Sequence, residues 1–220
     1  MRRQTNICFH GIGTPDRDLE SGEHPYWITN DQFEEILDYL AGKPSVRLTF
    51  DDGNASDVAI ALPALARRGL QATFFPVACR IGRTGSVGRD GLRALVRHGM
   101  EIGSHGMHHQ SWRRHSDPEL DEELVHARIV IAEESGVAVD TAACPLGEYD
   151  RRVLARLRAL GYTRVFTSDR SPAQSRSWLQ PRYSVTADDS PESVRATVEE
   201  RVPATAGAIS FGKRIVKRWR

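Results

Sequence analysis

The sequence predicts an α/β fold in which parallel strands alternate with helices, arranged as a barrel or an open sheet. Short apolar runs rich in β-branched and aromatic residues recur along the chain, and longer segments with helical spacing separate them. Polar clusters directly follow two of these runs, at the strand ends where α/β proteins carry functional side chains. The 220 residues contain no internal repeat and no long low-complexity linker, so we expect one domain over residues 1–220.

Several short segments are predicted as strands. They are residues 6–9, 46–50, 73–77, 101–104 and 164–167. Most of them are rich in β-branched or aromatic side chains, which favour extended backbone. Because helical segments lie between them, neighbouring strands are expected to run parallel.

Longer segments with apolar residues on one face are predicted as helices. They are residues 58–68, 89–98, 117–134 and 150–160. For the third helix, Asp117 is expected to be the N-cap and Pro118 the first helical residue, and Gly136 ends it. Gly161 is the stop signal of the fourth. The polar, proline-containing segment 168–177 is expected to be a surface loop.

Composition and charge are those of an ordinary globular protein, with 40% hydrophobic residues, 27% charged residues and a net charge of +1. That charge gives no overall attraction to nucleic acid. No apolar run reaches the roughly 18 residues of a membrane-spanning helix, and the N-terminus lacks the apolar core of a signal peptide, so we expect a cytoplasmic protein. Cys8, Cys79 and Cys144 are widely spaced, which favours reduced thiols.

Two acidic residues, Asp51 and Asp52, follow the strand predicted over 46–50, and Gly53 comes next. Adjacent carboxylates repel each other unless a positive charge lies beside them. On extended backbone they point to opposite faces, but a sharp turn at Gly53 lets both reach one pocket, where a metal cation would favour the arrangement. By itself, the same tripeptide is also typical of an ordinary turn.

Two histidines, His105 and His109, follow the strand predicted over 101–104. A spacing of four places both imidazoles on one face of a helical turn, as in helices that chelate zinc, whereas His108 points elsewhere. With one carboxylate of the aspartate pair they form a set of two imidazoles and one carboxylate that leaves positions open for water and substrate. Either cluster alone is frequently without function, but two clusters that end strands of one sheet converge, which favours a shared metal site.

The segment 142–150 contains a proline and a glycine, and by itself predicts only a turn that leads into a helix. In order, however, residues 49–53, 104–109 and 142–149 resemble the first three motifs of the polysaccharide deacetylase superfamily, the NodB-homology or carbohydrate esterase family 4 group. The resemblance continues to residues 181–185. It implies a distorted (β/α) barrel with about seven parallel strands, and hydrolysis of an N-acetyl group on an amino sugar.

The resemblance also implies roles for individual residues. Asp51 is the general base, and Asp52, His105 and His109 bind Zn²⁺ or another divalent ion such as Co²⁺ or Ni²⁺. Such an ion lowers the pKa of its bound water and polarises the amide carbonyl. The backbone N–H of Leu146 lies where the third motif supplies a donor to the oxyanion.

The sequence departs from the family pattern at three places. Residues 142–144 lack the arginine that orients the base; Arg182 is a candidate substitute, or forms a structural salt bridge. No Leu-x-His, the usual general acid, follows His126. His10, after the first strand, is a candidate acid, or merely caps the strand or binds a loop. Finally, Leu146 replaces an aromatic residue, which reduces stacking on a sugar.

De-N-acetylation of an amino sugar in a glycan, a polysaccharide or a lipid-linked saccharide is therefore the leading hypothesis, with an N-acetylated saccharide as partner. One alternative is hydrolysis of a non-sugar amide, and another is an inactive glycan-binding relative. Two histidines and a carboxylate also suit a non-haem Fe(II) oxygenase, although those sites favour β-rich scaffolds. The basic segment 213–220 is expected either to be solvated or to contact an anionic membrane surface.

Overall fold

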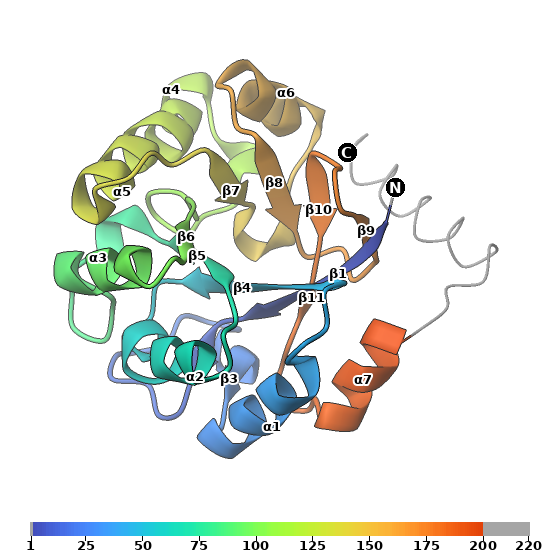
Figure 1. Cartoon of the computed structure of the whole chain (residues 1–220). Helices are drawn as coiled ribbons and strands as arrows, with labels where there is room; N and C mark the ends of the chain where they lie inside the picture. Colours follow the sequence, from blue (N-terminus) through green and yellow to red (C-terminus); the bar gives the residue numbers. More distant parts are fainter. Residues whose placement is uncertain (1, 200–220) are drawn as a thin grey trace.

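Parallel strands form the centre of the molecule and helices lie around them, as Figure 1 shows for the computed structural model, which describes residues 2–199. The main sheet has the order β11-β1-β4-β5-β6, with β9 antiparallel to β1. Its strands are β1 (Arg3–Phe9), β4 (Val46–Asp52), β5 (Ala72–Pro76), β6 (Glu101–Ile102), β9 (Ala173–Gln174) and β11 (Tyr183–Ser184).

A second parallel sheet has the order β10-β8-β7. Its strands are β7 (Thr141–Ala143), β8 (Arg164–Thr167) and β10 (Leu179–Pro181). A bridge between Ser104 and Ala142 links the two sheets on one side. On the other side, only Arg182 separates β10 from β11, so the chain passes directly from one sheet to the other. The α/β fold with parallel strands is confirmed, but the pairing is divided between two sheets, so a closed seven-stranded barrel is not confirmed.

The helices cover the outside of these sheets (Figure 1). They are α1 (Asn30–Leu40), α2 (Leu62–Arg67), α3 (Arg89–Arg97), α4 (Asp117–Asp121), α5 (Ala127–Ser135), α6 (Arg151–Ala159) and α7 (Pro191–Glu199). The π-helical turns Asp57–Ala61 and Glu122–His126 precede α2 and α5, so the long helix predicted over 117–134 is one run with a wider turn in its middle. Short β2 (Gly11–Ile12) and β3 (Trp27–Ile28) form a separate pair.

Side chains along β4 point alternately toward the apolar core and toward the candidate site. Phe50 points toward the helices, where its ring stacks 5.3 Å from Phe9 and 4.6 Å from Phe74, measured between ring centroids. Because side chains alternate along a strand, Thr49 and Asp51 point the other way, into the interior between the two sheets, where both contact Arg182. The strand thus places a carboxylate inside the molecule while its other face holds the apolar core.

Most predicted elements agree with the structure to within two residues, but some predictions were wrong. Ser116, not Asp117, caps α4, because Ser116 and Glu119 form a reciprocal capping box. The segment predicted as a surface loop, 168–177, contains β9 and the buried Ser171. Strand β7 was not predicted, because its small residues lack a β-branched or aromatic run.

Three further expectations concern a membrane-spanning helix, the basic C-terminal segment and the cysteines. The described residues form no helix with the length and apolar character needed to cross a membrane. The basic segment 213–220 lies outside the described residues. All three cysteines are free thiols, as expected; Cys8 and Cys144 are buried and Cys79 is half-buried.

Candidate active site

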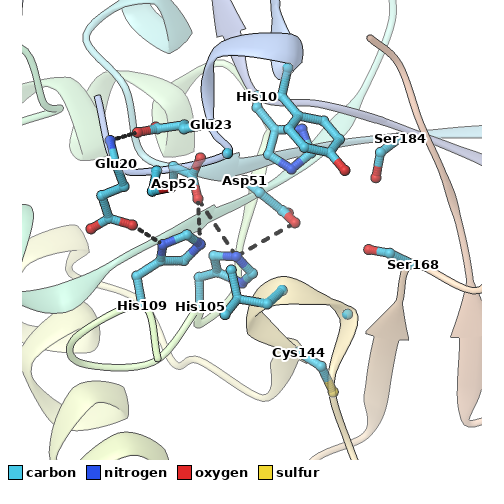
Figure 2. A pocket seen from close by; sticks show the side chains of 15 residues that line it. His10, Glu20, Glu23, Asp51, Asp52, His105, His109, Cys144, Ser168 and Ser184 are labelled. Carbon is cyan, nitrogen blue, oxygen red and sulfur yellow. Dashed lines mark hydrogen bonds and ion pairs between the residues drawn. The ribbon is translucent and has the colours of Figure 1, made fainter. Parts of the chain in front are cut away.

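Two aspartates lie at the carboxyl end of β4 and both line one pocket, a cavity of about 270 Å³. Asp52 has a φ of 74°, in the left-handed region that non-glycine residues rarely adopt. The turn expected at Gly53 therefore begins one residue earlier, and it brings the Asp52 side chain to the same side as that of Asp51 (Figure 2). Gly53, with a φ of 70°, continues the turn, and an added Cβ would lie 2.8 Å from Cβ of Pro76.

Asp51 is held by a buried arginine. The Nη1 and Nη2 atoms of Arg182 donate to Oδ1 and Oδ2 of Asp51, each over 2.6 Å. Arg182 is 0% exposed and also bonds Oγ1 of Thr49. Burial would raise the pKa of Asp51, but the guanidinium outweighs it and holds that pKa far below the usual range. The carboxylate is therefore ionised. Arg182, the candidate substitute for the missing arginine of the third motif, contacts Asp51 directly.

The two histidines converge on Asp52, but not through a helix. Residues 105–109 form an irregular loop in which His109 has a φ of 56°, so the predicted helical turn was wrong. Their ring centroids nevertheless lie 5.2 Å apart. Nε2 of His105 lies 3.6 Å from Oδ1 of Asp52, and Nε2 of His109 lies 3.3 Å from the same oxygen (Figure 2).

A buried carboxylate, Glu123, hydrogen-bonds to the backbone of this loop. It accepts the backbone N–H groups of Met107 and His108 and the indole N–H of Trp112. Gly106 makes this close approach feasible, because a Cβ there would lie 2.3 Å from Oε2 of Glu123. No sequence signal marked Glu123, since it lies in a helical segment 16 positions from Met107.

Hydrogen bonds fix which nitrogen of each imidazole faces Asp52. Nδ1 of His105 lies 2.9 Å from the Ala143 carbonyl oxygen, which can only accept, so Nδ1 carries the proton and Nε2 keeps its lone pair. Nδ1 of His109 similarly lies 2.7 Å from a carboxylate oxygen of Glu20. Burial lowers the pKa of His105 to about 4, so this imidazole is neutral at neutral pH.

These three side chains fit a divalent metal. Oδ1 of Asp52 is buried without a hydrogen-bond partner, and it faces the Nε2 atoms of both imidazoles. All three atoms lie within 4.8 Å of one another. Atoms that share one ion at roughly 2.1 Å each are roughly 3 to 3.5 Å apart, which is close to the observed separations from Oδ1. The donor set, two imidazoles and a carboxylate, suits zinc and similar ions.

A second cluster, Cys8, His10 and Asp51, also has ligand atoms within 4.8 Å of one another. It fits a metal less well. Burial strongly raises the pKa of the Cys8 thiol, and the Arg182 guanidinium already neutralises Asp51. We therefore assign the metal-like geometry to Asp52, His105 and His109.

His10 and Leu146 both line the same pocket. The His10 ring packs on Tyr26 with centroids 4.7 Å apart, and its Nδ1 is buried without a hydrogen-bond partner. Leu146 has a φ of 56° and its side chain is 65% exposed at the pocket edge. Hydrogen bonds in its turn run from Gly147 and Glu148, so the Leu146 N–H takes no part in them.

The site residues expected from the sequence thus line or adjoin one pocket. Sequence reasoning missed three residues. Glu20 and Tyr26 line the pocket, and Arg80, in the turn after β5, contacts Glu20 and lies near His109. Glu20 and Tyr26 lie in the loop between β2 and β3, which carries no recognisable motif.

A family model described as polysaccharide deacetylase matches residues 39–165. The chain is also similar to YxkH of Bacillus subtilis (strain 168), whose name assigns it to the polysaccharide deacetylases. The two are 22% identical over 179 residues, which cover 74% of this chain and 63% of YxkH. The chain therefore spans less than two thirds of that relative's length.

Solved structures with the same fold include the Streptococcus pyogenes deacetylase PplD in complex with acetate. It superposes with a TM-score of 0.77 at 17% identity, over 90% of this chain and 99% of that one. IcaB from Ammonifex degensii superposes with a TM-score of 0.72 at 22% identity, over 90% and 97% of the two chains. At these identities the likeness concerns the fold.

Proposed function

The chain belongs to the polysaccharide deacetylase family, and from this premise we propose that it is a metal-dependent hydrolase of N-acetyl groups. The proposed substrate is an amino sugar in a glycan, a polysaccharide or a lipid-linked saccharide. One observation carries the proposal: an Asp52 oxygen without a hydrogen-bond partner faces the Nε2 atoms of two imidazoles, beside a second carboxylate that an arginine keeps ionised.

Asp52, His105 and His109 would hold the ion, with Zn²⁺ preferred and Co²⁺ or Ni²⁺ as substitutes. When bound, the metal would supply a more acidic water and polarise the carbonyl of the substrate amide. The neutral state of His105 supports this assignment, because a protonated imidazole cannot bind a cation.

Asp51 is the proposed general base. It is buried and ionised, and its Oδ2 lies 3.7 Å from Nε2 of His105, so it borders the proposed ion. Arg182 already bonds both of its oxygens, which leaves the ligand role to Asp52. Asp51 would accept a proton from the attacking water as the new C–O bond forms. Arg182 would keep its two oxygens oriented through the paired hydrogen bonds.

His10 and Leu146 complete the proposed reaction. As the C–N bond of the amide breaks, His10 would donate a proton to the leaving nitrogen, and the products are acetate and a free amine. The Leu146 N–H would donate to the oxyanion. Since these residues and Arg182 come from positions 10 to 182, we also propose that the whole chain is one deacetylase domain.

The test is metal analysis of the purified protein, followed by acetate release from a panel of N-acetylated saccharides. We expect about one divalent ion per chain and acetate release that a chelator abolishes. Protein that binds no divalent metal would overturn the proposal.

The same assay separates the alternatives. Faster release from simple acylamides than from chitooligosaccharides would favour hydrolysis of a non-sugar amide. A metal-loaded protein that binds saccharides without releasing acetate would be an inactive relative. Activity in the absence of oxygen with zinc or cobalt would exclude the oxygenase.

A further inference from the structure

Glu20 reaches the outer edge of His109 from the loop between β2 and β3. Its Oε2 lies 2.7 Å from Nδ1 of His109, whereas Asp52 faces Nε2 on the other side of the same ring (Figure 2). The family model matches residues 39–165, so Glu20 lies outside the matched region. The contact therefore comes from a segment that precedes the residues matched by the family model.

The contact with Glu20 decides which nitrogen of the neutral His109 ring carries the proton. An ionised carboxylate only accepts, so Nδ1 of His109 carries a proton, and in the neutral imidazole the lone pair is on Nε2, toward Asp52. Arg80 pairs with the other oxygen of Glu20. Its Nη2 also lies 3.4 Å from Nδ1 of His109, but two donors cannot bond, so Arg80 acts on Glu20.

The backbone around Glu20 is held in place, although its side chain is 48% exposed. The Glu20 N–H donates to Oε2 of Glu23 over 2.8 Å. Glu23 in turn pairs with Arg17, which also donates to Oδ1 of Asn54 over 2.9 Å. Asn54 follows Asp52 by two positions, so the loop is attached to the segment that carries a proposed metal ligand.

On the basis of the proposed metal-dependent function, we infer that Glu20 is a positioning residue of the metal centre. It fixes the tautomer and the orientation of His109 and makes Nε2 a stronger donor, while Arg80 holds the carboxylate in place. Carboxylates that bind a ligating imidazole in this way contribute roughly 10- to 100-fold to metal affinity. Because Glu20 is half exposed, we expect the lower end, about tenfold.

The experiment compares zinc affinity in the full-length wild type, Glu20→Ala, Glu20→Gln and the control Asp18→Ala. Asp18 is an exposed carboxylate two positions earlier, so its removal matches the change in charge. Zinc affinity is measured by competition with a chromophoric chelator, and the absorption spectrum of the Co²⁺-loaded protein reports ligand geometry. Melting of the metal-free proteins checks that each variant is folded.

We expect the zinc dissociation constant of Glu20→Ala to rise about tenfold, with an altered Co²⁺ spectrum, and that of Asp18→Ala to remain unchanged. Glu20→Gln, which keeps a neutral acceptor, should lose less. Wild-type zinc affinity in Glu20→Ala, or an equal loss in Asp18→Ala, would overturn the inference. Wild-type protein that binds no zinc would instead overturn the proposed function.

Discussion

Asp51 shows how one distant side chain decides the state of another. An unpaired carboxyl group at its depth would be neutral, because burial disfavours charge, but Arg182 reverses this preference through two short hydrogen bonds. The third motif of this chain has alanines and a cysteine where the family pattern has an arginine. A residue in the turn between β10 and β11 thus provides the positive charge that the motif lacks.

Asp51→Asn should retain zinc and lose most of its turnover. The amide cannot accept the proton of the attacking water, so we expect kcat to fall about 10²- to 10⁴-fold. Metal content and circular dichroism establish that the variant is loaded and folded. A loaded variant with wild-type kcat would remove Asp51 from the role of base.

Arg182→Met should destabilise the protein by about 3–5 kcal/mol, because it leaves a fully buried carboxylate without its partner. The pKa of Asp51 should rise, so any remaining activity should be lost at a higher pH than in the wild type. Urea denaturation measures the first effect and the pH profile of kcat/KM the second. Arg182→Lys restores the charge but not the paired geometry, and should recover only part of either. A stability loss under about 1 kcal/mol would contradict this account.

The lowered pKa of His105 predicts how the stability of the metal-free protein depends on pH. Its pKa falls from 6.5 to about 4 on folding, so between these values the unfolded chain binds a proton that the folded chain does not. The contribution of this group to stability is therefore fully present above pH 6.5 and decreases as the pH falls toward about 4. The total loss is about 3 kcal/mol.

Urea denaturation of chelator-treated protein across this pH range, with His105→Asn as the comparison, isolates the effect. The asparagine amide can still donate to the Ala143 carbonyl but does not titrate. The variant should show a weaker pH dependence in this window than the wild type. Identical slopes for both proteins would contradict the assignment.

At the scale of elements, the end of β6 brings the histidine loop to the site. Beyond Ile102, hydrogen bonds from Gly103 to Phe74 and from Ser104 to Thr141 continue the pairing on both sides. The His105 N–H still donates to the Pro76 carbonyl of β5, so the chain leaves the sheet after His105, between β5 and β7. Gly103 is needed here because a Cβ would lie 2.3 Å from the Phe75 ring.

Gly103→Ala should therefore destabilise the protein by about 1–3 kcal/mol through overpacking, and it should also weaken zinc binding, since His105 lies two residues away. Gly88→Ala is the control: its added Cβ would meet only the Gly82 Cα, at 3.8 Å. Chemical denaturation and zinc titration of both variants test this. Equal stability of Gly103→Ala and wild type would show that the Phe75 ring moves freely aside.

For the whole molecule, the proposed ion joins the last residue of β4, Asp52, to two histidines that follow β6. Bound metal should therefore stabilise the fold, by about 4 kcal/mol when free zinc exceeds its dissociation constant 1,000-fold. Chelation should lower Tm and zinc should restore it, whereas His109→Ala should respond weakly. A Tm that is indifferent to chelator in zinc-loaded wild type would exclude a metal that links these segments.

Much of this site could be predicted from the sequence because its residues come directly after strands. The apolar runs before Asp51 and before His105 predict strands, and parallel strands end at one edge of a sheet. That reasoning identified Asp51, Asp52, His105 and His109 as candidate site residues before any interatomic distance was known. The helical geometry assumed for the histidines was wrong, yet they converge, because the strand ends bring them together and the loop with Glu123 orients them.

The sequence by itself determined the α/β class, the four longest strands, most of the α-helices and the four polar residues at two strand ends, because periodicity and local turn residues encode these features. Only the tertiary structure decided that Arg182 holds Asp51, 131 positions away, and that Glu20 holds His109, 89 positions away. Such contacts depend on strand order and loop packing, which the periodicity of neighbouring residues does not encode. The physical state of each site residue, ionised or neutral, was therefore settled by distant partners and by burial.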